Sequence, residues 1–251
     1  MKNCLVLGSG RSGTSMIAGT LSTAGYFIGH SPMPPTPSNP KGYYESFDIQ
    51  DINEELLASV VPKRPWFRHR WLFRDRRPRP TQRWLAAVPL GTNIVRPSPM
   101  DARIKALVEH EPYCFKDPRF SYTLPAWRPF LRDTAFVCVF RDPASTASSI
   151  LKECADMPYL WDLVMDFEQA IEVWTLMYRH IVEIHRHDGP WLFMHYDQGL
   201  TGDGIRRLEA FVDARLNSAF PDPALRRRAP ERSVPRAAQQ LYEQLCELAA
   251  Y

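Results

Sequence analysis

The amino-acid sequence predicts a three-layer α/β fold, in which helices cover both faces of a mostly parallel sheet. Short apolar runs alternate with longer segments of helical periodicity, which is the pattern of successive β-α-β units. These runs are apolar throughout, as expected of strands that are buried on both faces. The first run also enters a glycine-rich turn that a helical segment follows. We expect strands at residues 4–7, 113–115, 135–140 and 191–194.

Helices are predicted where apolar residues recur at steps of three and four. The first is expected to stop at Gly25, and the second to begin near Phe47, where Ser46 or Asp48 can cap it. Pro143 is typical of the first position of a helix. In chain order, the expected helices cover residues 14–24, 47–60, 101–110, 124–131, 143–154, 160–187, 202–214 and 235–249.

Length and composition favour one globular domain spanning residues 1–251. Hydrophobic residues make up 45% of the chain and charged residues 24%, which argues against overall disorder. The net charge of +3 is too small to indicate a general nucleic-acid binder. No apolar run approaches the roughly 18–20 residues of a membrane span, and the N-terminus has no signal-type apolar region. We therefore expect a cytoplasmic protein with no nucleic-acid partner and no membrane span.

Cysteine and histidine spacings do not indicate a metal site. The five cysteines are scattered and form no CxxC pair, so we expect reduced, mostly packed thiols. His180, His185 and His187 fall on one predicted helix, but they lack zinc-ligand spacing with a carboxylate.

Two segments depart from the regular pattern. Residues 26–46 are rich in proline, glycine and serine and read as a long irregular loop. Residues 62–80 hold eight Lys or Arg, one acid and several aromatic residues. A solvated, partly ordered insertion explains this composition. The functional alternative is a lid or an anion-attracting rim over a substrate cleft, and stacking on nucleic acid is a third possibility.

The glycine-rich turn has the features of a phosphate-binding loop, or P-loop. It reads Gly8-Ser9-Gly10-Arg11-Ser12-Gly13-Thr14-Ser15 and lies between a predicted strand and a predicted helix. Glycines let backbone N–H groups converge on an anion, and the helix start adds free N–H groups. In nucleotide kinases the position of Thr14 carries the lysine that reaches the β/γ-phosphates. Its replacement disfavours an ATP–magnesium site.

The same loop resembles that of the sulfotransferases that use 3′-phosphoadenosine 5′-phosphosulfate (PAPS), which typically reads as a basic residue followed by Ser-Gly-Thr-(Thr/Ser). A second signature of this family is an arginine after a later strand and a serine eight residues on, which grip the 3′-phosphate. Here the strand at 136–140 leads into Arg141, and Ser149 follows at that spacing. The resemblance implies that the 5′-phosphosulfate is bound by Gly10, Arg11, Ser12, Gly13, Thr14 and Ser15.

Two further segments are similar to the tyrosylprotein-sulfotransferase-like and bacterial branch of that family. Lys116-Asp117-Pro118 matches a turn whose lysine stabilises the transferring sulfonate. Tyr196-Asp197-Gln198 resembles a Tyr-Glu-Gln segment whose tyrosine lies at the nucleotide. The four motifs follow the family's order from residue 8 to residue 198. The implied co-substrate is PAPS, with Lys116 and Arg11 as catalytic cations and Tyr196 at the nucleotide.

The sequence departs from the family in three places. The position of the usual glutamate base holds Pro32, so Glu45 is our first candidate, ahead of Asp117 and His30. The position of a second basic residue after Arg141 holds Glu153, which is no phosphate ligand. The C-terminal segment that covers the nucleotide is not recognisable, although the arginines at 226–228 could approach it.

These residues suit an in-line sulfuryl transfer without a metal, because the sulfonate carries a single negative charge that fixed cations and N–H donors can stabilise. The acceptor would be the hydroxyl or amine of a small molecule, a glycan or a natural product, and its proton needs a nearby base. Two alternatives stay open. One is a P-loop kinase for a small molecule, and the other is a non-catalytic nucleotide-binding protein of the same fold.

Overall fold

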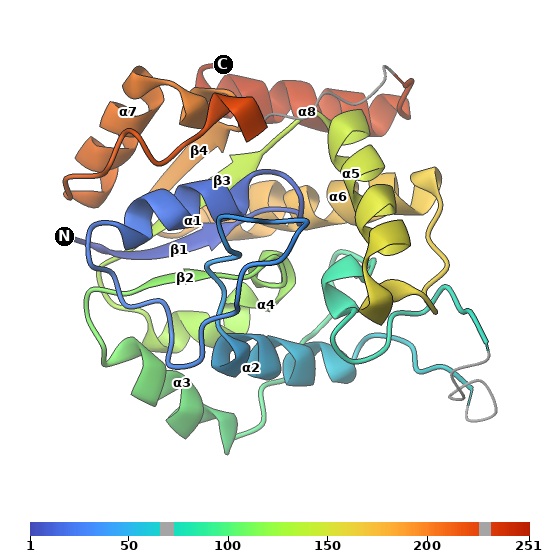
Figure 1. Ribbon diagram of the computed structural model, residues 1–251. Coiled ribbons are helices and arrows are strands. Elements are labelled where there is room, and N and C mark those ends of the chain that lie inside the picture. The colour runs from blue at the N-terminus through green and yellow to red at the C-terminus, as the bar shows by residue number, and fades with distance from the viewer. Residues whose placement is uncertain (66–72, 226–231) are drawn as a thin grey trace.

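The computed structural model describes residues 1–65, 73–225 and 232–251. Its centre is a parallel sheet of four strands in the order β2-β1-β3-β4 (Figure 1). In chain order these are β1 (Asn3–Leu7), β2 (Cys114–Lys116), β3 (Thr134–Phe140) and β4 (Trp191–His195). Leu5 pairs with Phe115 on one side and with Phe136 on the other. Strands at these places were predicted, and the mostly parallel α/β fold is confirmed.

Helices pack on both faces of the sheet (Figure 1). Cys4 and Val6 of β1 face one core, which includes apolar residues of two helices, α1 (Thr14–Ser22) and α7 (Gly202–Val212). Leu5 and Leu7 point to the opposite, larger core. The helices that contribute to that core are α2 (Phe47–Ala58), α3 (Met100–Val108), α4 (Phe120–Trp127), α5 (Pro143–Asp156), α6 (Phe167–Arg179) and α8 (Arg236–Ala249).

The long helix predicted at 160–187 is wrong in its extent. The α-helix begins at Phe167, because Asp166 caps it: its carboxylate accepts the Gln169 amide, and the Gln169 side chain accepts the Asp166 amide. After Arg179 the chain continues as one π turn and one short 3-10 turn. Periodic apolar residues alone did not reveal the capping box that divides this segment.

The helix predicted at 124–131 instead occupies Phe120–Trp127 and contains Pro125. A proline has no N–H for the carbonyl four residues earlier, which is that of Ser121. His185 replaces this donor, since its Nε2 lies 3.0 Å from the Ser121 oxygen. The imidazole must therefore carry its proton on Nε2. A tertiary contact thus stabilises a helix that the local sequence disfavours.

The described part of segment 62–80 is tied to the body of the protein. Arg64 is only 6% exposed, and its Nη1 lies 2.6 Å from Asp162. Arg79 binds the same carboxylate at 2.9 Å, and Arg77 binds Asp75 at 2.7 Å. These three arginines are each paired with a carboxylate, and residues 62–65 and 73–80 do not line the main cavity described below. The expected aromatic–arginine stretch at 66–72 lies outside the described residues.

Among the described residues, no helix is long and apolar enough to cross a membrane. The five cysteines have free thiols.

Candidate active site

The carboxyl ends of the four strands bring the sequence motifs to one edge of the sheet. The loop at residues 8–13 follows β1, Lys116 ends β2, Arg141 follows β3, and Tyr196 follows β4. In a parallel sheet these ends all lie at the same edge, where open α/β sheets bind their ligands. Four motifs that are distant in sequence are therefore neighbours for a topological reason.

The phosphate-binding loop has the backbone that a phosphate cradle needs. Gly13 has a φ of 95° and caps the start of α1 in the left-handed conformation. A Cβ added at Gly13 would lie 2.4 Å from the Tyr196 ring, so only glycine leaves room there. Tyr178 holds the loop to the sheet, because its hydroxyl accepts the Ser9 amide at 3.1 Å and donates to the Val139 carbonyl at 2.7 Å. From the sequence, Tyr178 is expected only as one residue of the predicted helix at 160–187.

The residues of this loop differ in their orientation. Gly10, Arg11, Gly13, Thr14 and Ser15 line the cavity at the sheet edge. Ser12 is buried, and its Oγ lies 3.5 Å from Thr146 Oγ1 on α5. Its hydroxyl therefore faces the neighbouring helix, unlike that of Ser15.

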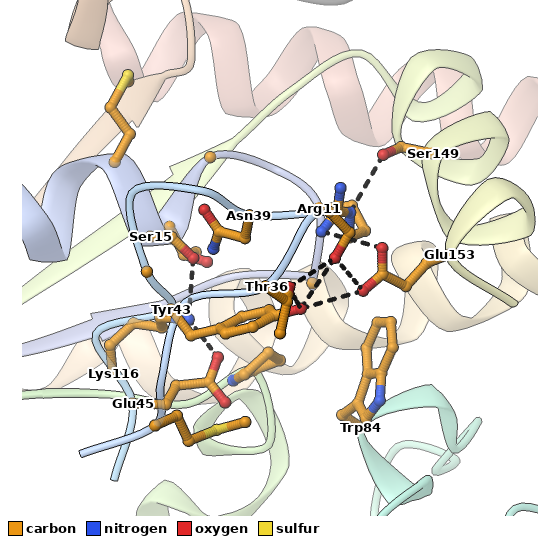
Figure 2. A pocket seen from close by; sticks show the side chains of 18 of the residues that line it. Arg11, Ser15, Thr36, Asn39, Tyr43, Glu45, Trp84, Lys116, Ser149 and Glu153 are labelled. Carbon is orange, nitrogen blue, oxygen red and sulfur yellow. Dashed lines mark hydrogen bonds and ion pairs between the residues drawn. The ribbon is translucent and has the colours of Figure 1, made fainter. Parts of the chain in front are cut away.

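Arg11 turns its side chain toward α5 (Figure 2). Its Nε donates to Ser149 Oγ at 3.2 Å, and its Nη1 lies 3.3 Å from Glu153 Oε2. Ser149 and Glu153 are one helical turn apart, so both face the loop. The two predicted nucleotide ligands, Arg11 and Ser149, are in direct contact.

Arg141 and Tyr196 pack against each other beside Gly13 of the phosphate-binding loop. The guanidinium carbon of Arg141 lies 4.7 Å from the centre of the Tyr196 ring. The Tyr196 amide donates to the Phe140 carbonyl at 2.8 Å, which fixes the ring next to the end of β3. Since the same ring packs against Gly13, Tyr196 connects Arg141 to the phosphate-binding loop.

Lys116 and Glu45 form an ion pair at the floor of the site (Figure 2). Both residues are buried, and the Lys116 ammonium also donates to Ser15 Oγ at 3.2 Å. Gln50 of α2 donates to the second oxygen of Glu45. A cation and a carboxylate thus lie together beside the first turn of α1.

The other two candidate bases have different surroundings. Asp117 is fully buried and pairs with Arg119 at 3.0 Å. Burial raises the pKa of Asp117, although the Arg119 charge opposes this shift. His30 is exposed, and its ring faces Phe27 and His110. Of the three candidates, Glu45 is the one that lines the cavity, among the residues described.

The residues that the sequence predicted for the site, except Ser12, Asp117 and His30, line one cavity of about 840 Å³. Arg11 and Arg141 both line it, although they follow different strands. Lys116 and Glu45 line the same space. The cavity is large enough for a nucleotide together with a second small molecule.

A scan against protein-family models matches the sulfotransferase family over residues 4–201. The chain belongs to this family. Among solved structures it resembles the sulfotransferase domain of the Synechococcus PCC 7002 olefin synthase, with a TM-score of 0.51 and 18% identity over 100% of this chain and 96% of that one. It is also similar to sulfotransferase STF9 from Mycobacterium avium, with a TM-score of 0.46 and 16% identity over 99% of this chain and 75% of that one. No curated protein sequence matches the chain. At 18% identity, the similarity to the olefin synthase domain supports the fold alone.

The sulfotransferase has a second, more apolar wall that the sequence motifs did not indicate. Met33, Trp84, Met157 and Tyr159 line the cavity on this side. Trp84 packs on the phosphate-binding loop, since a Cβ added at Gly10 would lie 2.5 Å from its Cζ3. Trp84 follows the basic segment in the chain, and no local spacing predicts that it reaches the loop.

Within the described ranges, the sulfotransferase has no group of three or more His, Cys, Asp or Glu that could hold a metal ion. Two histidines in the turns that follow α6, His180 and His185, contact backbone carbonyls instead. His180 Nε2 lies 3.0 Å from the Val88 carbonyl, and His185 binds Ser121 as described above. The observed roles of these side chains are therefore structural.

Proposed function

We propose that this sulfotransferase moves a sulfuryl group from PAPS to the hydroxyl or amine of a small-molecule, glycan or natural-product acceptor. The observation that carries the proposal is that Arg11 and Arg141 line the same cavity as the Lys116–Glu45 pair. Two arginines can then hold opposite ends of a doubly phosphorylated adenosine. The transfer would take place at the floor, between the loop and the apolar wall.

The loop suits the phosphosulfate end of PAPS. The amides of Thr14 and Ser15 open α1 and have no partner within the helix, so they are free to donate to an anion. Gly13 has no side chain that could block an anion from reaching these amides, and the adjacent Tyr196 ring leaves no room for one. Arg141 and Ser149 would bind the 3′-phosphate, with Tyr196 beside the nucleotide.

The chemical step needs one base and one cation. Glu45 would accept the proton of the acceptor hydroxyl or amine as the acceptor atom bonds to sulfur. Lys116 and Arg11 would stabilise the negative charge that builds on the bridging oxygen as the bond from sulfur to that oxygen breaks. The products are the sulfated acceptor and adenosine 3′,5′-bisphosphate. Because Lys116 contacts Ser15 as well as Glu45, one ammonium group can reach both the base and the phosphate-binding loop.

The wall of Met33, Trp84, Met157 and Tyr159 supports an acceptor with an apolar body that carries its nucleophile at one end. Such an acceptor would place its apolar part against this wall and its hydroxyl or amine at Glu45.

Thermal unfolding with ligands tests the proposal. Adenosine 3′,5′-bisphosphate at one hundred times its Kd should stabilise the protein by about 2.7 kcal/mol without magnesium. For a chain of this size that corresponds to a rise in Tm of roughly 5–10 °C. Arg11→Ala should reduce the shift. A large shift with ATP and magnesium but none with the bisphosphate would favour the kinase alternative.

Turnover separates an enzyme from a non-catalytic binding protein. Radiolabelled PAPS should pass its label to members of a panel of phenols, alcohols, amines and sugars. Glu45→Ala should bind the bisphosphate normally and transfer little label. Tight bisphosphate binding with no transfer to any acceptor, and no PAPS consumption, would favour the non-catalytic alternative.

A further inference from the structure

Glu153 is an unexpected residue in this cavity, because it places a carboxylate at the end where anions should bind. It lies on α5 and is only 3% exposed. A buried carboxylate is costly unless other groups satisfy its oxygens. Its partners therefore reveal what its charge does.

Both oxygens of Glu153 are engaged by groups from other parts of the chain. Oε1 accepts hydrogen bonds from the Ser38 hydroxyl at 3.0 Å and the Tyr43 hydroxyl at 3.3 Å. Oε2 lies 3.3 Å from Arg11 Nη1. One carboxylate thus joins α5 to the phosphate-binding loop and to the irregular segment before Glu45 (Figure 2).

That segment, residues 33–45, is a closed loop along the cavity. Its two ends meet through the Met33 amide and the Glu45 carbonyl, 2.8 Å apart. Inside it, the Tyr43 hydroxyl lies 2.8 Å from Thr36 Oγ1 and 3.0 Å from Ser38 Oγ. These hydroxyls form one cluster, and Glu153 is the charged acceptor on which the cluster converges. We call residues 33–45 the base loop, because the loop ends at Glu45.

A second contact fixes the far side of the base loop. Lys41 donates to the Phe220 carbonyl at 2.7 Å, and its ammonium lies 5.2 Å from the Phe220 ring centre. This contact leaves Ser38 and Tyr43 to be held by Glu153, and Thr36 to be held through them. Without the carboxylate the Ser38 and Tyr43 hydroxyls would lose their charged acceptor, and the part of the loop that faces Arg11 would be free to lift.

We propose that Glu153 is a positioning residue: it latches the base loop over the cavity and orients Arg11, so that the position of Glu45 depends on the state of the phosphate-binding loop. The latch itself follows from the contacts above, whereas the coupling to nucleotide rests on the proposed function. An anion bound at Arg11 would hold the guanidinium in place, and Glu153 would pass this restraint to Ser38 and Tyr43.

Amide hydrogen exchange of the base loop tests the latch in the nucleotide-free protein. Glu153→Ala should speed exchange of residues 33–45 about tenfold, since it removes hydrogen bonds to a charged acceptor. Tyr43→Phe should speed it by a smaller factor, and it keeps Glu153 and the fold intact. Tyr44→Phe is the matched control, because the ring of this neighbouring tyrosine packs on Phe220. Exchange unchanged in both Glu153→Ala and Tyr43→Phe would overturn the latch.

Glu153→Gln separates the two contacts of the carboxylate. Its amide oxygen can still accept from Ser38 and Tyr43, but the charge opposite Arg11 is gone. We expect exchange of the base loop closer to wild type than in Glu153→Ala. Equal loss of protection in the Gln and Ala variants would mean that the hydroxyl contacts do not hold the loop.

Hydrogen exchange with and without the bisphosphate tests the coupling between the phosphate-binding loop and the base loop. In the wild type, saturating adenosine 3′,5′-bisphosphate should slow exchange of the base loop further, and Glu153→Ala should lose this extra protection while still binding the ligand. Equal protection in both proteins would refute the coupling. If the wild type does not bind the bisphosphate at all, the proposed function fails, yet the nucleotide-free comparison still decides the latch.

Discussion

The cavity has two walls that are built in different ways. The proposed nucleotide corner, which we define as the loop at 8–15 together with Arg141, Ser149 and Tyr196, is built from strand ends and from residues of α1 and α5. The acceptor wall, formed by the base loop with Trp84, Met157 and Tyr159, consists mostly of irregular chain. Backbone hydrogen bonds of the sheet position the first wall. Side-chain contacts position the second.

This difference explains where specificity can change in such a fold. The acceptor wall depends on separate side-chain contacts, such as the Tyr43–Glu153 hydrogen bond and the Lys41 hydrogen bond to the Phe220 carbonyl. None of these residues belongs to a strand of the sheet. The nucleotide corner cannot vary in this way, because Gly13, Tyr196 and Arg141 pack on one another. Under the proposed function, the first wall suits a constant co-substrate and the second suits a variable acceptor.

The largest effect should come from Lys116, which connects the two walls. We expect Lys116→Met to lower turnover about 10²- to 10³-fold, because a preorganised cation at the transferring group is lost. Bisphosphate binding should change much less. Transfer of label from PAPS and a binding isotherm measure the two quantities, with Lys105→Met on α3 as the control. Normal turnover in Lys116→Met would remove this lysine from the mechanism.

A smaller loss is expected at the nucleotide corner alone. Arg141→Met should weaken bisphosphate binding about 10- to 100-fold, the range for a charge-assisted contact to phosphate. Arg128→Met is a close control: Arg128 also stacks on an aromatic ring, with its guanidinium carbon 5.0 Å from the Phe136 ring centre. It precedes β3, whereas Arg141 follows this strand. Equal weakening by both variants would indicate a general loss of stability instead of a lost ligand contact.

Gly13→Ala tests whether the corner is as tightly packed as its contacts indicate. The added methyl group would meet the Tyr196 ring, in a backbone conformation that already disfavours alanine. Gly25→Ala is the control. Gly25 also has a positive φ, of 87°, but no atom lies within 4 Å of a Cβ added there. The free energy of unfolding should fall by about 1–3 kcal/mol more for Gly13→Ala than for Gly25→Ala. Similar values in chemical denaturation would mean that Tyr196 moves away at little cost.

Mild acid should have the smallest effect, through His185, which contacts the Ser121 carbonyl of α4 away from the cavity. Burial lowers the pKa of His185 to about 3, while the unfolded value is about 6.5. The stability that neutral His185 contributes is complete above the unfolded value and is lost as the pH falls toward the folded value. Lowering the pH from 7 to 6 should then cost about 0.7 kcal/mol from this residue. His185→Gln should reduce the slope of Tm against pH, whereas His187→Gln, at an exposed position, should not.

Local sequence predicted most of the regular structure, and it singled out residues that line the proposed nucleotide corner of the cavity. The apolar runs identified all four strands, because a strand buried on both faces needs such residues at every position. Gly13, Arg141 and Tyr196 were found because each directly follows or precedes a regular element. The extent of α6 and the start of α4 were missed. The Asp166–Gln169 capping box sets the start of α6, and the His185 contact to Ser121 supports α4 across Pro125; the apolar stripe shows neither.

The sequence by itself determined a parallel α/β sheet, a glycine-rich turn between the first strand and helix, and the family motifs, since each strand, turn and motif depends on residues that are near one another in the chain. Only the tertiary structure decided that Glu45 meets Lys116, that Trp84 packs on Gly10, and that Glu153 joins Arg11 to the base loop. The physical reason is that these contacts join irregular segments, whose paths are set by single ion pairs and hydroxyl contacts from distant parts of the chain. The periodicity and spacing of residues in the sequence do not predict such contacts.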